Sequence, residues 1–191
     1  MTMKATARET PDRDSKYMGL AWFYAAFSKD PNTQVGACIA RVDGVENFVL
    51  GCGYNGPPRE MNDDEVPWHR PPPDDPNAYS KYDVMVHAEV NAIDHVCGHG
   101  VLSGATLYVT AMPCSACMLR IAKKGIRRVV YTPFKSGEGS IMRNAAVFAK
   151  SEETARLSGV ILEEFEGDLN WMADWVGKMT EWGIIGGRGR D

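Results

Sequence analysis

Hydrophobic positions follow two different spacings along the chain, and these spacings predict a series of helices and strands. Apolar side chains that recur every three or four residues predict helices over residues 13–28, 86–97, 114–124 and 143–158. Short runs rich in β-branched and aromatic residues predict strands over residues 35–42, 46–54, 105–112, 127–132 and 160–165. Because helices and strands alternate after the first two strands, we expect a three-layer α/β domain. Its mixed sheet should hold about five strands between helices, the later ones parallel.

Turn and capping residues mark several boundaries of these elements. Residues 43–44 (Asp-Gly) lie between the first two strands and are a common hairpin signal. Gly125 and Gly159 each follow a predicted helix and indicate where it ends. Asp14 or Ser15 is expected to cap the first helix.

Two segments do not fit this alternation. Residues 55–84 are rich in proline and longer than an ordinary connection, so they are either functional or an insertion. The tail carries one apolar helical face, formed by Trp171, Met172, Trp175, Val176, Met179 and Trp182. This face packs on the sheet or contacts another subunit, and we favour the subunit contact. We therefore divide the chain into a loose N-terminus (1–12), a domain (13–165) and a helical extension with tail (166–191).

Composition and charge narrow the classes of function. The chain has 191 residues, 44% of them hydrophobic, and a formal net charge of -4, which is a poor match for gripping long nucleic acid. No stretch approaches the ~18 apolar residues of a membrane span, and the N-terminus has no apolar signal-peptide core. Five cysteines without an export signal favour reduced thiols and metal ligation over a disulfide framework. We expect a cytoplasmic protein.

Two short motifs have the residue types of a catalytic zinc site. His87, Cys114 and Cys117 supply one imidazole and two thiolates, and such sites take three protein ligands and leave one position for water. Cys114 and Cys117 are three residues apart, so one helical turn presents both sulfurs on the same side. Glu89 is free to act on the zinc-activated water as a general base and acid. These residues would therefore supply the Zn²⁺ site and the proton carrier that a hydrolytic deamination requires.

Other interpretations of these residues remain open. A Cys-x-x-Cys pair by itself is more often structural zinc or redox-active, and a closed structural site would need a fourth protein ligand. The candidates for that ligand are Cys38, Cys52, His95, Cys97 and His99. The segment from His95 through Cys97 to His99 could also hold a second metal. We favour a helix end with a buried cysteine, because the spacing is poor for one ion.

Several segments of the chain together resemble the cytidine deaminase superfamily, and within it the dCMP deaminases. The zinc motifs match the signature of nucleobase deaminases, His-x-Glu followed by Pro-Cys-x-x-Cys. The resemblance covers about residues 15–132 and includes residues 28–37, 51–56, 63–68, 87–93, 107–109 and 113–117. It implies a cytidine deaminase-like fold, zinc held by His87, Cys114 and Cys117, and Glu89 as the proton shuttle.

The same resemblance implies further contacts with substrate and effectors. Asn55 would contact the sugar, and backbone groups near Ala88 and Met112 would read the pyrimidine edge. The expected effector residues are Gly53, Tyr54, Asn55 and Gly56. The resemblance also implies a homo-oligomer, often a hexamer. It further implies activation by dCTP with Mg²⁺ and inhibition by dTTP.

Three more residues are candidates for substrate binding. Lys29 is placed to meet a phosphate or to lie solvated at the surface. Tyr131 either flanks the base or packs in the core. Phe134 stands where many members of the family carry a tyrosine near the base.

The predicted substrate is dCMP, and the dUMP formed would supply thymidylate synthesis. The alternatives are another cytosine substrate such as dCTP or cytidine, adenosine in tRNA, and a non-catalytic zinc-binding interaction protein. The acidic balance and the residues Asp63, Asp64 and Glu65 disfavour tRNA.

Overall fold

The computed structural model describes residues 9–43, 46–97, 101–133 and 139–185. The described elements follow the order α1 (Arg13–Ala25), β1 (Gly36–Asp43), β2 (Glu46–Tyr54), the 3₁₀ helix η1 (Lys81–Asp83), α2 (Ala88–Asp94), β3 (Thr106–Val109), α3 (Ser115–Lys123), β4 (Arg128–Tyr131), α4 (Gly139–Ser158), β5 (Ile161–Glu164) and α5 (Asn170–Glu181). The sequence pattern did not predict η1, which is a single short turn inside the proline-rich segment.

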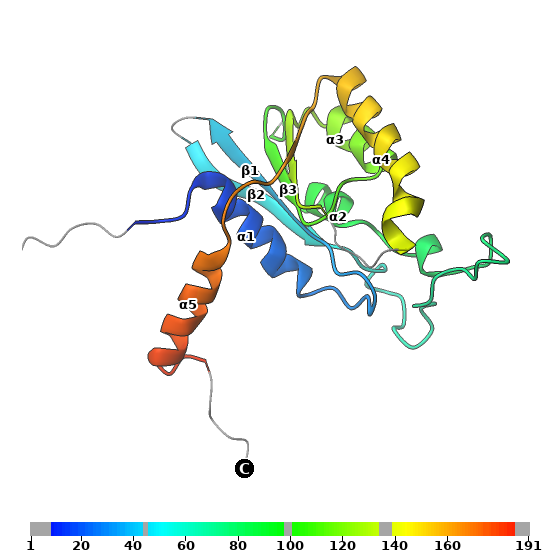
Figure 1. The fold of residues 1–191 in the computed structure, drawn as a ribbon, viewed down its shortest axis with the longest axis horizontal. Helices are drawn as coiled ribbons and strands as arrows, with labels where there is room; N and C mark the ends of the chain where they lie inside the picture. The colour runs from blue at the N-terminus through cyan, green and yellow to red at the C-terminus, as the bar shows by residue number, and fades with distance from the viewer. Residues whose placement is uncertain (1–8, 44–45, 98–100, 134–138, 186–191) are drawn as a thin grey trace, which may run out of the picture.

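The strands form one mixed sheet in the order β2-β1-β3-β4-β5. β1 runs antiparallel to both β2 and β3, whereas β3, β4 and β5 run parallel to one another. The predicted mixed sheet with parallel later strands is therefore confirmed. In Figure 1, α1 lies on one side of this sheet, and α2, α3 and α4 lie on the other.

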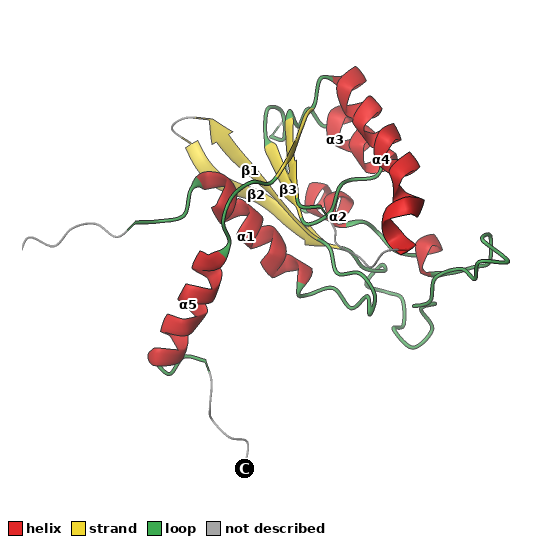
Figure 2. Cartoon of the chain, in the orientation of Figure 1, coloured by secondary structure: helices red, strands yellow, loops and turns green. Residues whose placement is uncertain are grey.

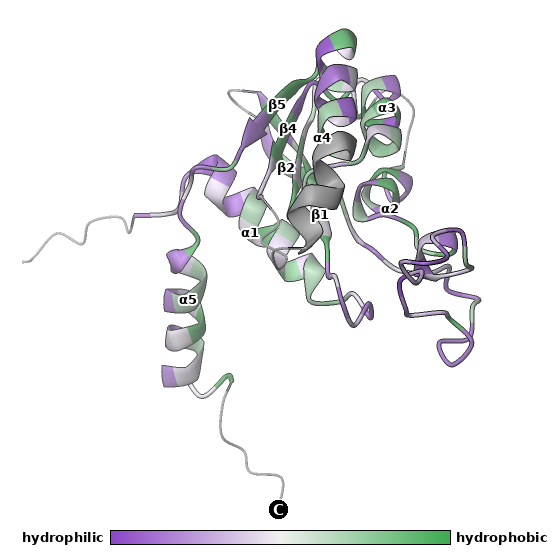
Figure 3. Cartoon of the chain, turned by 45° about the vertical axis from the view of Figure 1, so that its right-hand side comes forward, coloured by the Kyte–Doolittle hydropathy of each residue, from purple (hydrophilic) through white to green (hydrophobic). Residues whose placement is uncertain are grey.

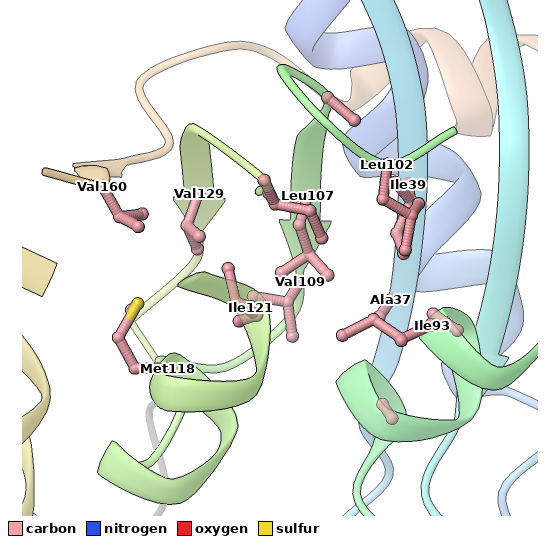
Figure 4. Close-up of a cluster of buried hydrophobic side chains, with 14 of the residues drawn as sticks. Ala37, Ile39, Ile93, Leu102, Leu107, Val109, Met118, Ile121, Val129 and Val160 are labelled. Atoms are coloured by element: carbon pink, nitrogen blue, oxygen red, sulfur yellow. The ribbon is translucent and has the colours of Figure 1, made fainter. Parts of the chain in front are cut away.

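Alternating side chains of the strands supply the cores on the two faces of the sheet. On β1, Ala37 and Ile39 face the helices α2, α3 and α4, and on β3 Leu107 points the same way (Figure 4). Cys38 on β1 and Tyr108 on β3 pack instead against α1. This period of two is the geometry of a pleated strand, so each central strand is buried on both faces.

The helix boundaries follow from capping groups and from glycine. The carboxylate of Asp12 accepts a hydrogen bond of 2.9 Å from the backbone N–H of Ser15 and so caps α1. The expectation that Asp14 or Ser15 caps this helix was wrong, because Asp14 instead accepts hydrogen bonds from the Arg128 guanidinium. Gly125 and Gly159 follow α3 and α4 with φ of 79° and 67°, as a left-handed helix stop requires.

Most of the chain between β2 and α2 is loop (Figure 2). Its end is fixed to the domain by a two-stranded bridge between Gly56 and Val86. The segment therefore leaves and rejoins the sheet at neighbouring points. None of the helices in the described part of the chain has the length and apolarity needed to cross a membrane.

Helix α5 contacts the body of the domain mainly through its first turn. A side chain placed on the buried Gly19 of α1 would meet the ring of Trp171 at 2.4 Å, so these two helices are in close contact there. No described residue of α5 is buried. The helix extends away from the sheet in both views, and Figure 3 shows hydrophobic residues along one of its sides.

Because the core is packed on both faces of the sheet, we expect that shortening a buried side chain of a central strand lowers the free energy of unfolding strongly. Leu107 is fully buried on β3, so Leu107→Ala should lower the free energy of unfolding by about 2–5 kcal/mol. The matched control is Leu119→Ala on the exposed side of α3, where the change should stay within about 0.5 kcal/mol. Urea unfolding of both variants measures the difference, and equal costs would contradict this packing.

Candidate metal and catalytic site

Two helices begin at the residues that the sequence predicts as metal ligands. His87 is the N-cap of α2 and Cys114 is the N-cap of α3. Neither side chain makes a capping hydrogen bond to its own helix, so both are available for other contacts. Cys117 lies one turn into α3 and is buried.

The structure brings the three side chains together. The Sγ atoms of Cys114 and Cys117 lie 3.7 Å and 3.3 Å from Nδ1 of His87. The three ligand atoms all lie within 4.8 Å of one another. Ideal tetrahedral zinc with Zn–S of about 2.3 Å and Zn–N of about 2.0 Å separates sulfur from nitrogen by about 3.6 Å. The donor set therefore fits a zinc ion in both chemistry and spacing.

Close contact among the three donors shifts the pKa of each of them. Hydrogen bonds from Cys117 and His87 lower the pKa of the Cys114 thiol to about 3. The hydrogen bond with Cys114 raises the pKa of His87 to about 9. The bond to Cys114, together with burial, raises the pKa of Cys117 above its ordinary value. Cys114 is therefore a thiolate at neutral pH, which is the form in which cysteine binds a metal.

Glu89 places a buried carboxyl group beside the three donors. Its side chain is 4% exposed, and it contacts the thiol of Cys117. Burial raises the pKa of this carboxyl, and the charge of His87 opposes that shift. A carboxyl group so placed is able to exchange protons with a molecule bound at the donors.

Close packing under α2 fixes the height of His87 and Glu89 above the sheet. A Cβ atom on Gly53 of β2 would lie 2.3 Å from the Ala92 nitrogen and 2.7 Å from the Ala88 carbonyl oxygen. Only glycine allows this approach of backbone to backbone. The side-chain amide of Asn91 adds a hydrogen bond of 2.8 Å to the Tyr54 carbonyl. The structure thus gives Gly53 a packing role.

A second helix holds the start of α3. The buried hydroxyl of Ser151 on α4 donates a 2.7 Å hydrogen bond to the carbonyl oxygen of Pro113, directly before Cys114. Sequence reasoning missed this residue, since nothing in its local pattern distinguishes it from any other serine within a helix.

Comparison with known proteins agrees with this geometry. The family model described as the cytidine and deoxycytidylate deaminase zinc-binding region matches residues 11–133. The chain belongs to the cytidine and deoxycytidylate deaminase family. This membership confirms the resemblance drawn from the sequence, and it identifies the described zinc-binding region with the part of the chain that holds His87, Cys114 and Cys117.

Curated members of this family include close relatives in sequence. Deoxycytidylate deaminase of Pongo abelii is 40% identical over 115 residues, which are 60% of this chain and 61% of that protein. The chain therefore spans less than two thirds of that relative. Deoxycytidylate deaminase of Mus musculus is 35% identical over 149 residues, or 78% of this chain and 77% of that protein.

A solved structure supports the fold. The dCMP deaminase of cyanophage S-TIM5, in complex with dCMP and dUMP, aligns with a TM-score of 0.59 at 21% identity. The alignment covers 83% of this chain and all of that one. At this identity the likeness concerns the fold, and it confirms the predicted deaminase-like fold class.

The predicted substrate residues have varied surroundings. Asn55 is buried, and its side chain bonds the carbonyl of Thr33 at 2.9 Å and the N–H of Val35 at 2.8 Å. Lys29 is exposed and forms a surface ion pair with Asp63. Ala88 begins α2, Tyr131 ends β4, and Met112 lies in the connection between β3 and α3. Phe134 lies outside the described residues.

The predicted effector residues stay predictions, and the second metal remains the disfavoured alternative. Tyr54 ends β2 and Gly56 joins the bridge to Val86, which explains their placement without an effector. Among the described residues, the one cluster able to share a metal is the trio described above. Nδ1 of His95 lies 2.7 Å from the carbonyl of Cys52, Cys97 is exposed rather than buried, and His99 lies outside the described residues. These contacts favour a helix end over a second metal site.

The contact beneath α2 predicts that Gly53→Ala separates the helix from the sheet. We expect this overpacked variant to lose about 1–3 kcal/mol of unfolding free energy and part of its bound zinc. Thermal unfolding and zinc analysis by atomic absorption measure both effects. Gly177→Ala is the matched control, because nothing lies within 4 Å of a Cβ atom there. A Gly53→Ala protein with full stability and zinc content would refute this role for Gly53.

Proposed function

We propose that the chain catalyses the hydrolytic deamination of dCMP to dUMP and ammonia. The observation that carries this proposal is the buried carboxyl of Glu89 beside a compact His-Cys-Cys donor set. Relatives named deoxycytidylate deaminase at 35% and 40% identity support the substrate. In the proposal His87, Cys114 and Cys117 hold the zinc ion.

The chemistry divides between the metal and the carboxyl group. A zinc ion at these donors supplies a Lewis acid that makes water a nucleophile near neutral pH. Glu89 takes a proton as the water oxygen bonds to C4 of the cytosine, and it delivers a proton to ring nitrogen N3. It then takes the proton of the new hydroxyl on C4 and passes it to the exocyclic amine, so that C4=O forms as the bond from C4 to that nitrogen breaks and ammonia leaves. The low exposure of Glu89 keeps bulk water from competing for these protons.

The remaining contacts with the nucleotide follow from the family resemblance. We propose that Asn55 faces the sugar and that backbone groups of Ala88 and Met112 face the base, beside Tyr131. The intermediate exposure of Met112 and Tyr131 is compatible with contact to a ligand. Lys29 would meet the phosphate only after it leaves Asp63, so its contribution should be small. The role of Phe134 near the base stays a prediction.

The proposal also covers regulation by nucleotides, cellular location and the division of the chain into domains. Two regulatory properties stay predictions: activation by dCTP with Mg²⁺, and inhibition by dTTP through residues 53–56. The supply of dUMP for thymidylate synthesis and a cytoplasmic location also stay predictions. We also keep the division into a deaminase domain at residues 13–165 and an extension at 166–191. The match of the family model to residues 11–133 supports the first part of that division.

The proposed chemistry predicts a selective effect of Glu89→Gln. The variant should bind zinc like the parent chain but lose about 10²–10⁴-fold or more in deamination rate, because its side chain no longer accepts the proton. Release of ammonia and dUMP from dCMP measures the rate, and metal analysis measures zinc. The same assay is run with cytidine, dCTP and adenosine in tRNA as substrates, each with and without dCTP or dTTP as effector.

The outcomes separate the alternatives. Full turnover by Glu89→Gln would contradict the proton transfer. Preference for cytidine or dCTP would keep the chemistry and change the substrate. A parent chain that binds zinc and releases no ammonia from any substrate would support the non-catalytic zinc-binding protein. Cys114→Ser, which removes a thiolate donor, is the companion variant in which both zinc and activity should fall.

We further propose that the protein is a homo-oligomer, up to a hexamer, and that α5 contributes to its contacts. The helix carries an apolar face, yet none of its described residues is buried within the chain. Trp22 and Phe23 on neighbouring α1, and Phe27 just after it, are also exposed. Exposed apolar area of this kind is typical of contact surfaces between proteins.

This arrangement predicts that a charge on α5 weakens assembly. Val176 is 48% exposed, so Val176→Glu should leave the fold intact and lower the mass found by light scattering. Glu181→Gln, on the same helix, is the control and should keep the parent mass. Unchanged mass for Val176→Glu at low protein concentration would exclude α5 from the contact.

A further inference from the structure

A buried ion pair joins two segments that are far apart in sequence. The ammonium group of Lys81 lies 2.9 Å and 2.6 Å from the two carboxylate oxygens of Asp30, and both side chains are 2% exposed. Each buried ion costs several kcal/mol of desolvation, and apolar replacements of such pairs are often as stable. Net stability therefore does not account for this pair. Its geometry, in contrast, joins two segments of backbone.

Asp30 fixes the turn that leads into β1. One of its oxygens also accepts hydrogen bonds of 2.8 Å and 3.2 Å from the backbone N–H groups of Asn32 and Thr33. The carbonyl of Thr33 in turn accepts a 2.9 Å hydrogen bond from the side chain of Asn55. The ion pair thus reaches Asn55 through a continuous series of hydrogen bonds.

Lys81 fixes the approach to the donor cluster from the other side. Its carbonyl accepts hydrogen bonds from the N–H groups of Val84 and Met85, at 3.2 Å and 2.9 Å. Val86, the next residue, exchanges hydrogen bonds of 2.9 Å and 3.1 Å with Gly56. His87 follows directly, so the backbone that enters the metal site is tied to the residue beside Asn55.

These contacts form a closed ring through the ion pair. From Asp30 the ring passes to Asn55 and Gly56, crosses to Val86 and returns to Lys81. His87 leaves the ring at Val86. A change at the ion pair would therefore shift the rim of the site relative to His87 without removing any metal ligand.

We propose that Asp30 and Lys81 are positioning residues for the nucleotide site, acting through the ring that joins Asn55 to the backbone before His87. The proposal rests on the proposed deamination, because that reaction supplies the substrate whose binding is measured. A displacement of about 1 Å at such a rim is enough to cost about 10²-fold in rate. We expect the loss to appear mainly as a higher KM, since the metal ligands and Glu89 remain in place.

The test compares three variants with the parent chain. Lys81→Met breaks the pair and leaves a buried charge, whereas Asp30→Asn breaks it and keeps an oxygen for Asn32 and Thr33. The double variant Asp30→Asn/Lys81→Met removes the uncompensated charge. The single variants should lose stability. The double variant should regain much of the Tm and its zinc, yet keep a KM for dCMP at least about tenfold above the parent. Arg156→Met, which breaks an exposed pair with Glu153, should change neither KM nor Tm.

Each outcome decides between positioning and mere support of the fold. If KM of the double variant returns to the parent value together with Tm, the positioning role is refuted. If the double variant does not fold, Lys81→Arg replaces it. That variant keeps the charge and alters its geometry, so parental kinetics in it would also refute the proposal.

Amide exchange keeps this test independent of the proposed reaction. If the parent chain does not deaminate dCMP, the proposed function fails, and exchange still reports on the ring. Backbone amides of Gly56 and Val86 should exchange faster in the double variant or in Lys81→Arg than in the parent and in Arg156→Met. Equal protection in the parent, in Arg156→Met and in the ring variant used would refute the ring.

Discussion

The site depends on one constraint: the first residues of α2 and α3 must meet at the same edge of the sheet. His87 and Cys114 each cap one of these helices, so the position of a metal donor is the position of a helix end. The sheet supplies that position, because α2 rests on β2 and α3 follows β3. Any change that lifts either helix therefore moves a ligand, even when it lies far from the donors.

Glycine at residue 53 and serine at residue 151 show how this constraint is met on the two sides. Gly53 lets the backbone of α2 come within contact of β2, which sets the height of His87 and Glu89. Ser151 reaches from α4 to the carbonyl before Cys114 and holds the start of α3. The positions of the donors and of Glu89 are thereby fixed by packing that is otherwise ordinary for an α/β domain.

The position of the long proline-rich segment is also fixed by contacts with the rest of the fold. It leaves the sheet beside Gly56 and returns at Val86, where their backbones pair. Between these points it carries Lys81, whose charge is buried against Asp30 near the start of β1. The segment is therefore held to the rest of the fold at both of its ends and through this ion pair.

The order of helices and strands, the mixed sheet and the donors His87, Cys114 and Cys117 with Glu89 beside them were predictable from sequence. Periodicity and short motifs are local features of the sequence, so they can be recognised without knowledge of the fold. The partner of Asp14, the hydrogen bonds that engage Asn55 and the link from Asp30 to Lys81 were not predictable, because each joins groups whose proximity only the folded chain creates. Lys81 is a good example: its neighbours in sequence suggest a solvated lysine, and a carboxylate 51 residues away makes it a buried one.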